Sequence, residues 1–452
     1  MSLTSFFQTA RQGLVAAQAA TATAGANIAN AETPGYTRRS ARPTIATPPR
    51  GGLRIQLPHD HVVGGVGALS FERSRSALLD EAVRTGRAGY GGAGESAGLL
   101  GSLEAQLAGD GGDAFLGAFS DFSDAWANVA GAPTEVALRE TLLAAGDHLA
   151  RTLRSADARL TAQAEIVGRD LGATVDGVNA RLSEVAALNE QIRDARASGI
   201  EDFDARDRRD LALDALAEAA PFRMREEANG TVTVTLNGLA VVQELEALPL
   251  RAELPPDAAA PAVYATGSSA PLALDALDGG QIGGFLGALS DAIPATRDAL
   301  DALAADLVAR VNAAHATGTG LDGAGGRNVF DPTGTTAASI ALDAGLTPEA
   351  IAAGTQGPGD GAVATALAGL TDEVYTAAAN VLGDLGARVR SATARADASA
   401  AYLDHVGALR DGVTRVSIDE EMADLIRFQQ SYAASAKVLQ TATELFDTIL
   451  AL

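Results

Sequence analysis

The chain has 452 residues, too many for one hydrophobic core, and its 47% apolar but only 4% aromatic content favours closely packed helices. Its formal net charge of −23 argues against nucleic acid or an anionic membrane as a partner, because both repel an acidic surface. The absence of cysteine excludes disulfides and thiolate metal sites, and no apolar run approaches the roughly 18 residues of a membrane-spanning helix.

The first segment is predicted to be a long helix with one apolar face. Apolar and small residues recur there at alternating steps of three and four, the heptad pattern of a helix packed against a partner helix. The positions are Leu3, Phe7, Ala10, Leu14, Ala17, Thr21, Ala24, Ile28 and Ala31. Because no basic residue precedes Arg11, we expect no secretory signal. The protein then stays in the cytoplasm or leaves it by a route that needs no cleaved signal.

A turn should follow this helix near Asn30. Pro34 cannot lie inside a helix, and Pro34 with Gly35 suits the central pair of a type II turn. Tyr36 comes next and would anchor the turn through an aromatic ring with a polar tip. From the residues alone, the stretch 27–36 is as well explained by an ordinary helix end and turn as by a specific sequence signature.

The middle of the chain is predicted to be mainly helical. Residues 44–70 alternate weakly and contain Pro and Gly pairs, so short strands or a hairpin are expected there. Residues 71–87 should form a helix, which a Gly-rich patch at 89–101 interrupts. Residues 134–220 are almost continuously helical and must fold back or form an antiparallel rod. Between them lies a core stripe at helical spacing, formed by Phe115, Phe119, Phe122 and Trp126.

A corner is expected between Gly199 and Phe203, and a highly charged stretch follows it. Arginines and aspartates are interleaved in this stretch, so we expect a solvated helix face. The residues are Asp204, Arg206, Asp207, Arg208, Arg209 and Asp210.

The period then changes to that of strands. Three short strands at 222–227, 231–236 and 239–242 are separated by Asn-Gly pairs, which are strong hairpin signals. With the segments up to residue 278 they predict a small β-rich domain inserted between helices. Because such an insertion would lie far from the paired ends of the chain, we expect it on the outside of any tube.

Helix should return at residues 279–286 and continue to about His315. The glycines there suggest a phosphate loop, but the Lys-Ser/Thr ending and a preceding buried strand are missing. Residues 317–361 are rich in Gly, Thr, Pro and Asp and predict a loop-dominated lobe. Residues 361–416 are again predicted to be helical.

The last segment is predicted to be a second heptad helix. Ser417 is a plausible N-cap, with Glu420 completing a capping box. Gln429 and Thr443 occupy seam positions, where they either fix the register or face solvent beside a narrow seam. The seam positions are Ile418, Met422, Leu425, Gln429, Tyr432, Ala436, Leu439, Thr443, Phe446 and Leu450. We expect this helix to pair with the N-terminal helix, in a pair completed only when copies of the chain pack together.

Candidate catalytic or metal sites are weak. His59 and His61 flank an aspartate but lack a third ligand at workable spacing, and His315 near Asp322 is no stronger. Neither a Gly-x-Ser-x-Gly elbow nor a His-Glu-x-x-His helix occurs. The sequence therefore predicts a structural or binding protein, not an enzyme, without a cofactor or metal.

Four stretches of sequence carry a family resemblance. Asn27-Ile28-Ala29-Asn30 followed by Thr33-Pro34-Gly35-Tyr36, one helix length from the start, resembles the signature of bacterial flagellar axial proteins of the rod, hook and hook–filament junction. The string at residues 417–438 and the stretches at 189–192 and 208–214 resemble the hook-associated protein 1 family in particular.

The resemblance and the patterns together predict a mainly α fold with a smaller β-rich part, whose N- and C-terminal helices pair as a coiled coil. Residues 1–36 and 415–452 would form the paired, tube-forming domain. Residues 37–220 and 279–414 would form a helical rod domain containing the 317–361 lobe, and residues 221–278 the small outer domain.

The resemblance further implies a structural subunit of the hook–filament junction in the extracellular flagellum, exported by a type III apparatus. Implied partners are copies of the chain, hook protein, the second hook-associated protein and a cytoplasmic chaperone covering the C-terminal helix. Alternatives are a hook or distal-rod protein, a coiled-coil adaptor recruiting a soluble partner, or an exported hydrolase. Expected assembly residues are Leu3, Phe7, Leu14, Asn27, Ile28, Asn30, Pro34, Gly35, Tyr36, Met422, Leu425, Gln429, Tyr432, Leu439, Phe446 and Leu450.

Overall fold

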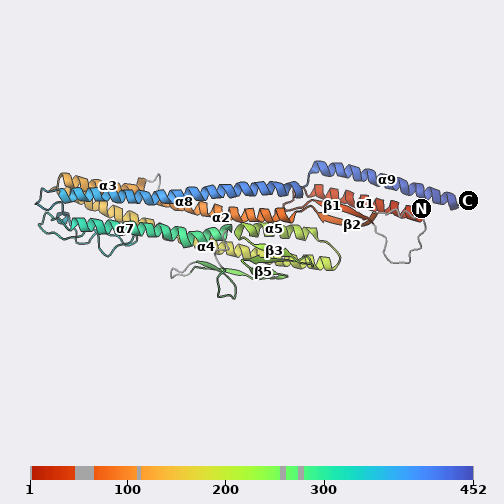
Figure 1. Cartoon of the computed structure of the whole chain (residues 1–452), viewed down its shortest axis with the longest axis horizontal. Coiled ribbons are helices and arrows are strands. Elements are labelled where there is room, and N and C mark those ends of the chain that lie inside the picture. The colour runs from red at the N-terminus through yellow and green to blue at the C-terminus, as the bar shows by residue number, and fades with distance from the viewer. Residues whose placement is uncertain (1–2, 46–65, 109–112, 255–260, 273–278, 451–452) are drawn as a thin grey trace.

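The computed structural model is an elongated bundle whose two chain ends lie together at one end (Figure 1). It describes residues 3–45, 66–108, 113–254, 261–272 and 279–450, and does not describe the side chains of 3–6, 43–45, 66–69, 113, 449 and 450. The weak histidine pair His59 and His61 therefore lies outside the described residues, as do the side chains of Leu3 and Leu450.

The terminal helices lie side by side, which confirms the predicted fold class. Helix α1 (Leu3–Ala29) and helix α9 (Ile418–Leu450) run antiparallel along one end of the molecule (Figure 1). Both are long because they contain no internal proline and are rich in alanine and other good helix formers. The Ser417 hydroxyl accepts a bond of 3.4 Å from the Glu420 N–H, so the predicted N-cap of α9 is confirmed.

A two-stranded hairpin follows α1 and packs along it. Strand β1 (Arg39–Ile45) pairs antiparallel with β2 (Val66–Arg73), beginning at the pair Arg39 and Arg73. The predicted hairpin is thus present, although its second strand extends to Arg73. The helix expected from residue 71 accordingly begins at Ala77 instead.

Helix α2 (Ala77–Ala108) runs unbroken through the Gly-rich patch, so the predicted interruption at 89–101 was wrong. Close packing explains why helix propensity was overruled there. A Cβ atom on Gly91 would lie well inside van der Waals distance of the Glu218 carbonyl oxygen, and one on Gly92 would lie 3.0 Å from Gly279 Cα. These glycines allow other segments to approach the α2 backbone directly.

The rod, by which we mean helices α2 to α8, continues with α3 (Asp113–Gly131), α4 (Val136–Ala197) and α5 (Phe203–Ala219). The predicted corner lies between α4 and α5, where Gly199 adopts a positive φ of 75°. Asp202 caps α5 by accepting a bond of 2.9 Å from Ala205 N–H. The predicted aromatic stripe of α3 is buried in the core.

The predicted meander is present and has one strand more than expected. Strands β3 (Arg223–Glu226), β4 (Val232–Leu236), β5 (Leu239–Gln243) and β6 (Glu246–Ala247) form an antiparallel sheet in that order. The turn between β4 and β5 has positive φ at Asn237 and Gly238, as the Asn-Gly pair predicts. Strands β7 (Leu250–Glu253) and β8 (Ala262–Ala265) form a separate pair.

These sheets lie against α4 and α5 on the side of the rod away from α8 (Figure 1). Their apolar side chains belong to the same hydrophobic core as the rod helices, so the β-rich segment has no separate core among the described residues. Asn189 of α4 attaches the first sheet, because its side chain bonds the Val232 N–H and carbonyl at 3.0 and 2.9 Å.

The remaining elements complete the rod. Helix α6 (Gly280–Gly287), a π-helical turn (Ala288–Ala292) and α7 (Ile293–His315) form one continuous segment, as predicted. The lobe at 317–361 is loop-dominated, with one 3₁₀ turn (Pro348–Ala350), and lies at the end opposite the termini (Figure 1). Helix α8 (Ala362–Thr414) then runs back along the whole rod toward α9.

Candidate assembly site

The contact between α1 and α9 is made largely by small residues of α1. Ala10, Ala17, Ala20 and Ala24 are all buried there. A Cβ on Gly13 would lie 3.0 Å from the Ser435 hydroxyl, and Asn27 is hydrogen-bonded to Glu421, which fixes the antiparallel register. Such small side chains permit close helix approach but bury little apolar area, so the pair is weakly stabilised in a single chain.

The burial pattern confirms only part of each predicted seam. In α1 the buried face combines Ala10, Ala17 and Ala24 with positions 13, 20 and 27, where the prediction had 14, 21 and 28. In α9 the predicted Leu425, Ala436 and Leu439 are half-buried, but the buried positions are Glu421 and Ala442, where the prediction had Met422 and Thr443. On α1 the packed stripe is thus the one that holds the smaller residues.

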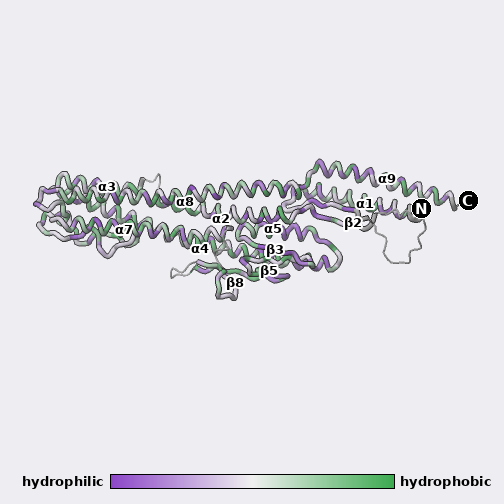
Figure 2. Tube along the Cα trace, viewed as in Figure 1, coloured by the Kyte–Doolittle hydropathy of each residue, from purple (hydrophilic) through white to green (hydrophobic). Residues whose placement is uncertain are grey.

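Several large residues of the predicted seams consequently remain exposed in the single chain. Met422, Tyr432 and Phe446 of α9 are 50%, 41% and 51% exposed, and Phe7 of α1 is 40% exposed. Gln429 and Thr443 also face solvent, whereas Leu14, Ile28, Leu425 and Leu439 are half-buried. Along α9 the trace alternates between hydrophilic and hydrophobic residues (Figure 2). Leu425 is half-buried while its apolar neighbours Met422 and Ile426 are exposed, so this helix offers apolar side chains on more than one face.

Asn27 joins three parts of this region and is the best-satisfied side chain of the signature. Its amide donates to Glu421 Oε2 at 3.0 Å and to the Arg39 carbonyl at 2.8 Å. Its oxygen accepts from the Arg39 N–H at 3.0 Å and from the Tyr36 hydroxyl at 2.9 Å. Asn27 thus uses its full hydrogen-bonding capacity to connect α1, β1 and α9.

The predicted turn follows immediately and is confirmed. The Tyr36 N–H donates to the Thr33 carbonyl at 3.1 Å, and Gly35 has a φ of +79°, which is the conformation that a type II turn requires after Pro34. The Asn30 side chain donates to the Ala26 carbonyl at the end of α1. Burial raises the pKa of Tyr36, so its hydroxyl stays protonated and can donate to Asn27.

Arg38 binds the beginning of α9. Its guanidinium bonds Glu421 at 2.6 Å and lies 3.4 Å from Glu420, while its backbone N–H donates to the Thr414 carbonyl at the end of α8. Glu421 is buried, so its charge depends on Arg38 and Asn27 for compensation. We call α1, the β1–β2 hairpin and α9 together the terminal unit.

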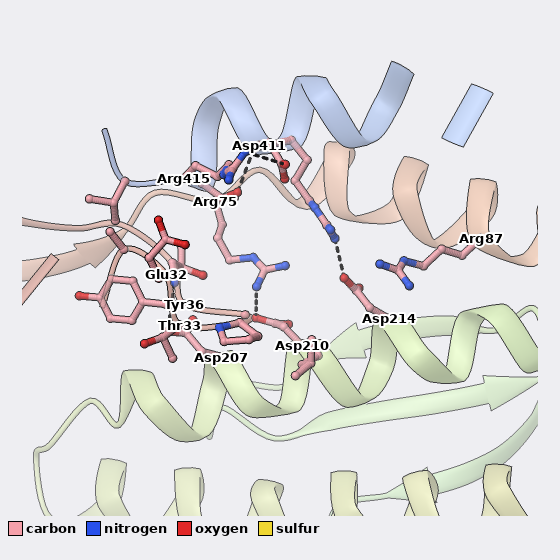
Figure 3. A pocket seen from close by; sticks show the side chains of 18 residues that line it. Glu32, Thr33, Tyr36, Arg75, Arg87, Asp207, Asp210, Asp214, Asp411 and Arg415 are labelled. Carbon is pink, nitrogen blue, oxygen red and sulfur yellow. Dashed lines mark hydrogen bonds and ion pairs between the residues drawn. The ribbon is translucent and has the colours of Figure 1, made fainter. Parts of the chain in front are cut away.

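Where the terminal unit meets the rod, three carboxylates of α5 lie on one helix face. Asp207, Asp210 and Asp214 follow one another at steps of three and four and are buried. Arginines approach them from several other segments, and Figure 3 shows Arg75 pointing onto Asp210 in this way. We call these three residues the carboxylate ladder.

Each carboxylate of the ladder has at least two guanidinium partners. Asp207 bonds Arg73 at 2.8 Å and lies 3.3 Å from Arg39. The partners of Asp210 are Arg73 at 2.8 Å, Arg75 at 2.6 Å and Arg84 at 3.3 Å. Those of Asp214 are Arg84 at 3.0 Å and Arg410 at 2.5 Å.

The electrostatics of the ladder favour ionised carboxylates. Burial alone would raise the pKa of Asp210, but Arg75, Arg73 and Arg84 outweigh it and hold that pKa below its ordinary value. Arg75 in turn has a raised pKa, because its bonds to Asp80 and the nearby Asp210 charge outweigh its burial. The region is therefore a closed network of compensated charges.

The expectation of a solvated face for this stretch was wrong. Asp207, Arg209 and Asp210 are buried, while Arg208 and Asp204 do face solvent. Arg209 lies on another side of α5 and donates to Asn189 Oδ1 and the Gly230 carbonyl; burial lowers its pKa to about 10. The spacing of the three aspartates was the available signal, since it places all three on one face.

The described part of the chain contains neither a candidate metal site nor a candidate membrane-spanning helix. Within those residues no three His, Asp or Glu side chains are placed to hold a metal ion. The weak pair His315 and Asp322 does not form a site, because His315 is buried between the Arg327 carbonyl and the Ala352 N–H. Nor is any described helix long and apolar enough to cross a membrane.

Three family models match the chain. Residues 100–330 match the helical domain of the flagellar hook-associated protein FlgK. Residues 7–37 match the model of the flagella basal body rod protein, and residues 414–452 match the C-terminal model of the flagellar basal body rod proteins FlgEFG.

Two relatives found by sequence agree with these matches. Flagellar hook-associated protein 1 of Bacillus subtilis is 26% identical over 98% of this chain and 97% of its own length. The Escherichia coli protein of the same name is 25% identical over 73% of this chain and 60% of its own length, so the chain spans less than two thirds of that relative. The flagellar hook junction protein FlgK from Burkholderia pseudomallei is similar in structure, with a TM-score of 0.49 and 23% identity over 56% of this chain and 46% of that one.

The two ends of the chain match rod-protein models and its interior matches a FlgK model, so all three matches are to flagellar proteins. Because the helical-domain model matches about half of the residues, this chain belongs to the flagellar hook-associated protein FlgK family, structural proteins of the hook–filament junction of the bacterial flagellum.

Proposed function

We propose that copies of this chain polymerise through α1 and α9 and thereby form the junction between hook and filament. The observation that carries the proposal is the exposure of α9, whose only buried apolar side chain among those described is Ala442. Its exposed large apolar residues are Ile418, Met422, Ile426, Tyr432, Val438, Leu445 and Phe446. Contact with neighbouring copies would remove this surface from water, which contributes about 25 cal/mol per Å².

We propose residues 1–36 and 415–452 as the tube-forming domain, residues 37–220 and 279–414 as the rod domain and residues 221–278 as the outer part. The hairpin β1–β2 packs along α1, which favours moving residues 39–45 and 66–73 from the rod to the terminal unit. The expected assembly residues are part of this proposal, with Met422, Tyr432 and Phe446 as the candidates for contact between copies.

The proposed neighbours are hook protein on one side and the second hook-associated protein on the other. The matches at the two termini are to rod-protein models, so the termini alone would also suit a hook or distal-rod protein. The FlgK match over residues 100–330 favours the junction. Since the family consists of structural proteins, we also propose that the chain has no catalytic role.

As part of the flagellum, an extracellular appendage, the chain has to leave the cell. We propose export through the flagellar type III apparatus without a cleaved signal, with a cytoplasmic chaperone covering α9 beforehand. The exposed apolar residues of α9 support this, because such a surface associates non-specifically when it is left uncovered.

Deleting residues 417–452 and a point substitution test the proposal together. Ile426→Glu places a charge on a side chain that is 52% exposed, so the single chain should still fold. Cells carrying either variant should secrete unassembled filament subunits and lose motility. The matched control Gln430→Glu, an exposed polar position on the same helix, should leave filaments intact. Normal filaments with Ile426→Glu would contradict assembly through this face.

A co-purification experiment tests the adaptor alternative. If α9 recruits a soluble partner instead, the purified chain should form a complex of fixed composition with that partner and fail to associate with itself. Under the proposal, concentrated chain associates with itself and the Ile426→Glu variant does not.

A further inference from the structure

The terminal unit and the rod are joined by only two short segments. These are residues 74–76 and 415–417, and neither of them contains a helix or a strand. Segments of this kind impose little constraint on the angle between the parts that they join. A single chain would therefore let its terminal unit pivot on the rod unless other contacts hold it.

The carboxylate ladder supplies contacts of the required kind, and its three members differ in what they hold. Asp207 faces the terminal unit, through Arg39 of β1, Arg73 of β2 and the Thr37 N–H. Asp214 faces the rod, through Arg84 of α2 and Arg410 of α8.

Asp210 lies between the other two and contacts both sides. It bonds Arg73 of β2 at 2.8 Å, Arg75 of the connecting segment at 2.6 Å and Arg84 of α2 at 3.3 Å. Because Arg39 and Arg73 are directly opposite each other in the hairpin, Asp207 is bound by both strands at the end of the hairpin next to α5. The hairpin therefore cannot rotate without breaking an ion pair on at least one strand.

Buried ion pairs hold the terminal unit at one angle to the rod better than apolar contacts would. An apolar interface can slide by a small step at little cost, whereas a buried charge that loses its partner is strongly destabilised. The hydrogen-bond geometry between carboxylate and guanidinium is also directional. A change in the orientation of the terminal unit would therefore break the pairs of Asp207 and Asp210 with the arginines of the hairpin.

We propose that Asp207 and Asp210 are positioning residues, which lock the terminal unit at one angle to the rod through the arginines of β1, β2 and α2. Asp214 anchors the ladder to the rod. The inference goes beyond assembly, because it concerns the single chain whether or not copies polymerise through α9.

Distance measurement between spin labels on the single chain tests the lock. The chain has no cysteine, so Ala187→Cys in α4 and Ala434→Cys in α9, both exposed, give unique labelling sites on the two parts. The labelled parent should show a single narrow distance distribution. In Asp207→Asn, which keeps the shape but removes the charge, that narrow distribution should be lost.

Two further variants separate charge from packing. Asp204→Asn is the matched control, since Asp204 also bonds Arg39 but is 77% exposed and lies outside the ladder; it should retain the narrow distribution. Asp207→Glu keeps the charge and should retain it as well. Circular dichroism must show parental helix content in Asp207→Asn, so that loss of position is distinguished from unfolding.

Retention of the narrow distribution in Asp207→Asn would overturn the inference. Equal broadening in Asp207→Asn and Asp207→Glu would overturn it too, because shape and not charge would then position the unit. Neither result bears on polymerisation through α9, which the Ile426→Glu experiment tests separately.

Discussion

The rod and the terminal unit are both built from helices packed at steps of three and four, yet only the rod is complete in one chain. In the rod, Phe122, Trp126 and Phe330 are at most 1% exposed, and the ring of Phe122 contacts the other two edge to face. In the terminal unit, small residues bring α1 and α9 together and large ones remain outside. The same periodicity thus describes a finished core and an unfinished interface.

The largest expected effect is a contrast between two aromatic positions. Trp126→Ala removes a fully buried ring next to Phe122 and His315 and should lower the free energy of unfolding by about 3–5 kcal/mol. Tyr432→Ala, at a 41% exposed position of α9, should change the unfolding of the single chain by less than about 1 kcal/mol. Urea denaturation of both variants measures this, and equal costs would show that α9 is as well packed as the rod.

Next in size is the loss of the Asn27 side chain. Asn27→Ala leaves Glu421, the Tyr36 hydroxyl and the Arg39 backbone without that partner, and each buried polar group left unsatisfied costs about 1–3 kcal/mol. The effect should be confined to the terminal unit, so amide exchange should accelerate in α1 and the first turns of α9. Unchanged exchange there, or acceleration in α3 and α4, would contradict the role of Asn27.

A smaller effect is expected when a glycine is replaced by alanine in each of the two regions. Gly91→Ala drives a methyl group into the Glu218 carbonyl in the rod, where backbone cannot yield easily, and should cost roughly 1–3 kcal/mol. Gly13→Ala meets only the Ser435 hydroxyl, which can rotate away, and the better helix propensity of alanine should offset the contact. Thermal unfolding of both variants checks this difference; a greater loss for Gly13→Ala would contradict the looser packing of the terminal unit.

The smallest effect concerns pH and appears only in acid. Because the folded-state pKa of Asp210 lies below its ordinary value of about 4, ionised Asp210 stabilises the fold above that value. This stabilisation is lost as pH falls through the lowered pKa, as its partners Arg73, Arg75 and Arg84 lose a counter-charge. The distribution of spin-label distances should therefore broaden below about pH 4 while the rod keeps its helix content. If the distribution broadened and the helix content fell at the same pH, the contact between the terminal unit and the rod would not be less stable to acid than the rod itself.

Much of the fold follows from sequence patterns, because local signals and tertiary packing agree there. The aromatic stripe of α3, the corner at Gly199 and the Asn-Gly turn between β4 and β5 were all predicted. The Gly-rich part of α2 was not, since propensity favours an interruption and only the approach of Glu218 and Gly279 explains the helix.

The candidate site was predicted in part. The Asn27 to Tyr36 string was singled out and lies at the centre of the terminal unit. On each terminal helix, the predicted stripe and the stripe beside it have every second seam position in common. The pattern alone therefore could not decide which of the two stripes faces the other terminal helix.

The carboxylate ladder was missed for a different reason. Charged residues are rarely buried, and the arginines that compensate Asp207, Asp210 and Asp214 come from positions 39, 73, 75, 84 and 410. No local pattern connects those positions with α5.

Amide hydrogen exchange on the purified single chain tests the central claim most directly, that α1 and α9 pair but are completed only by other copies. Amides of α9 should exchange faster than those in the middle of α8 in the single chain and become protected when chains assemble. Protection of α9 in the single chain equal to that of α8, with no change on assembly, would contradict it.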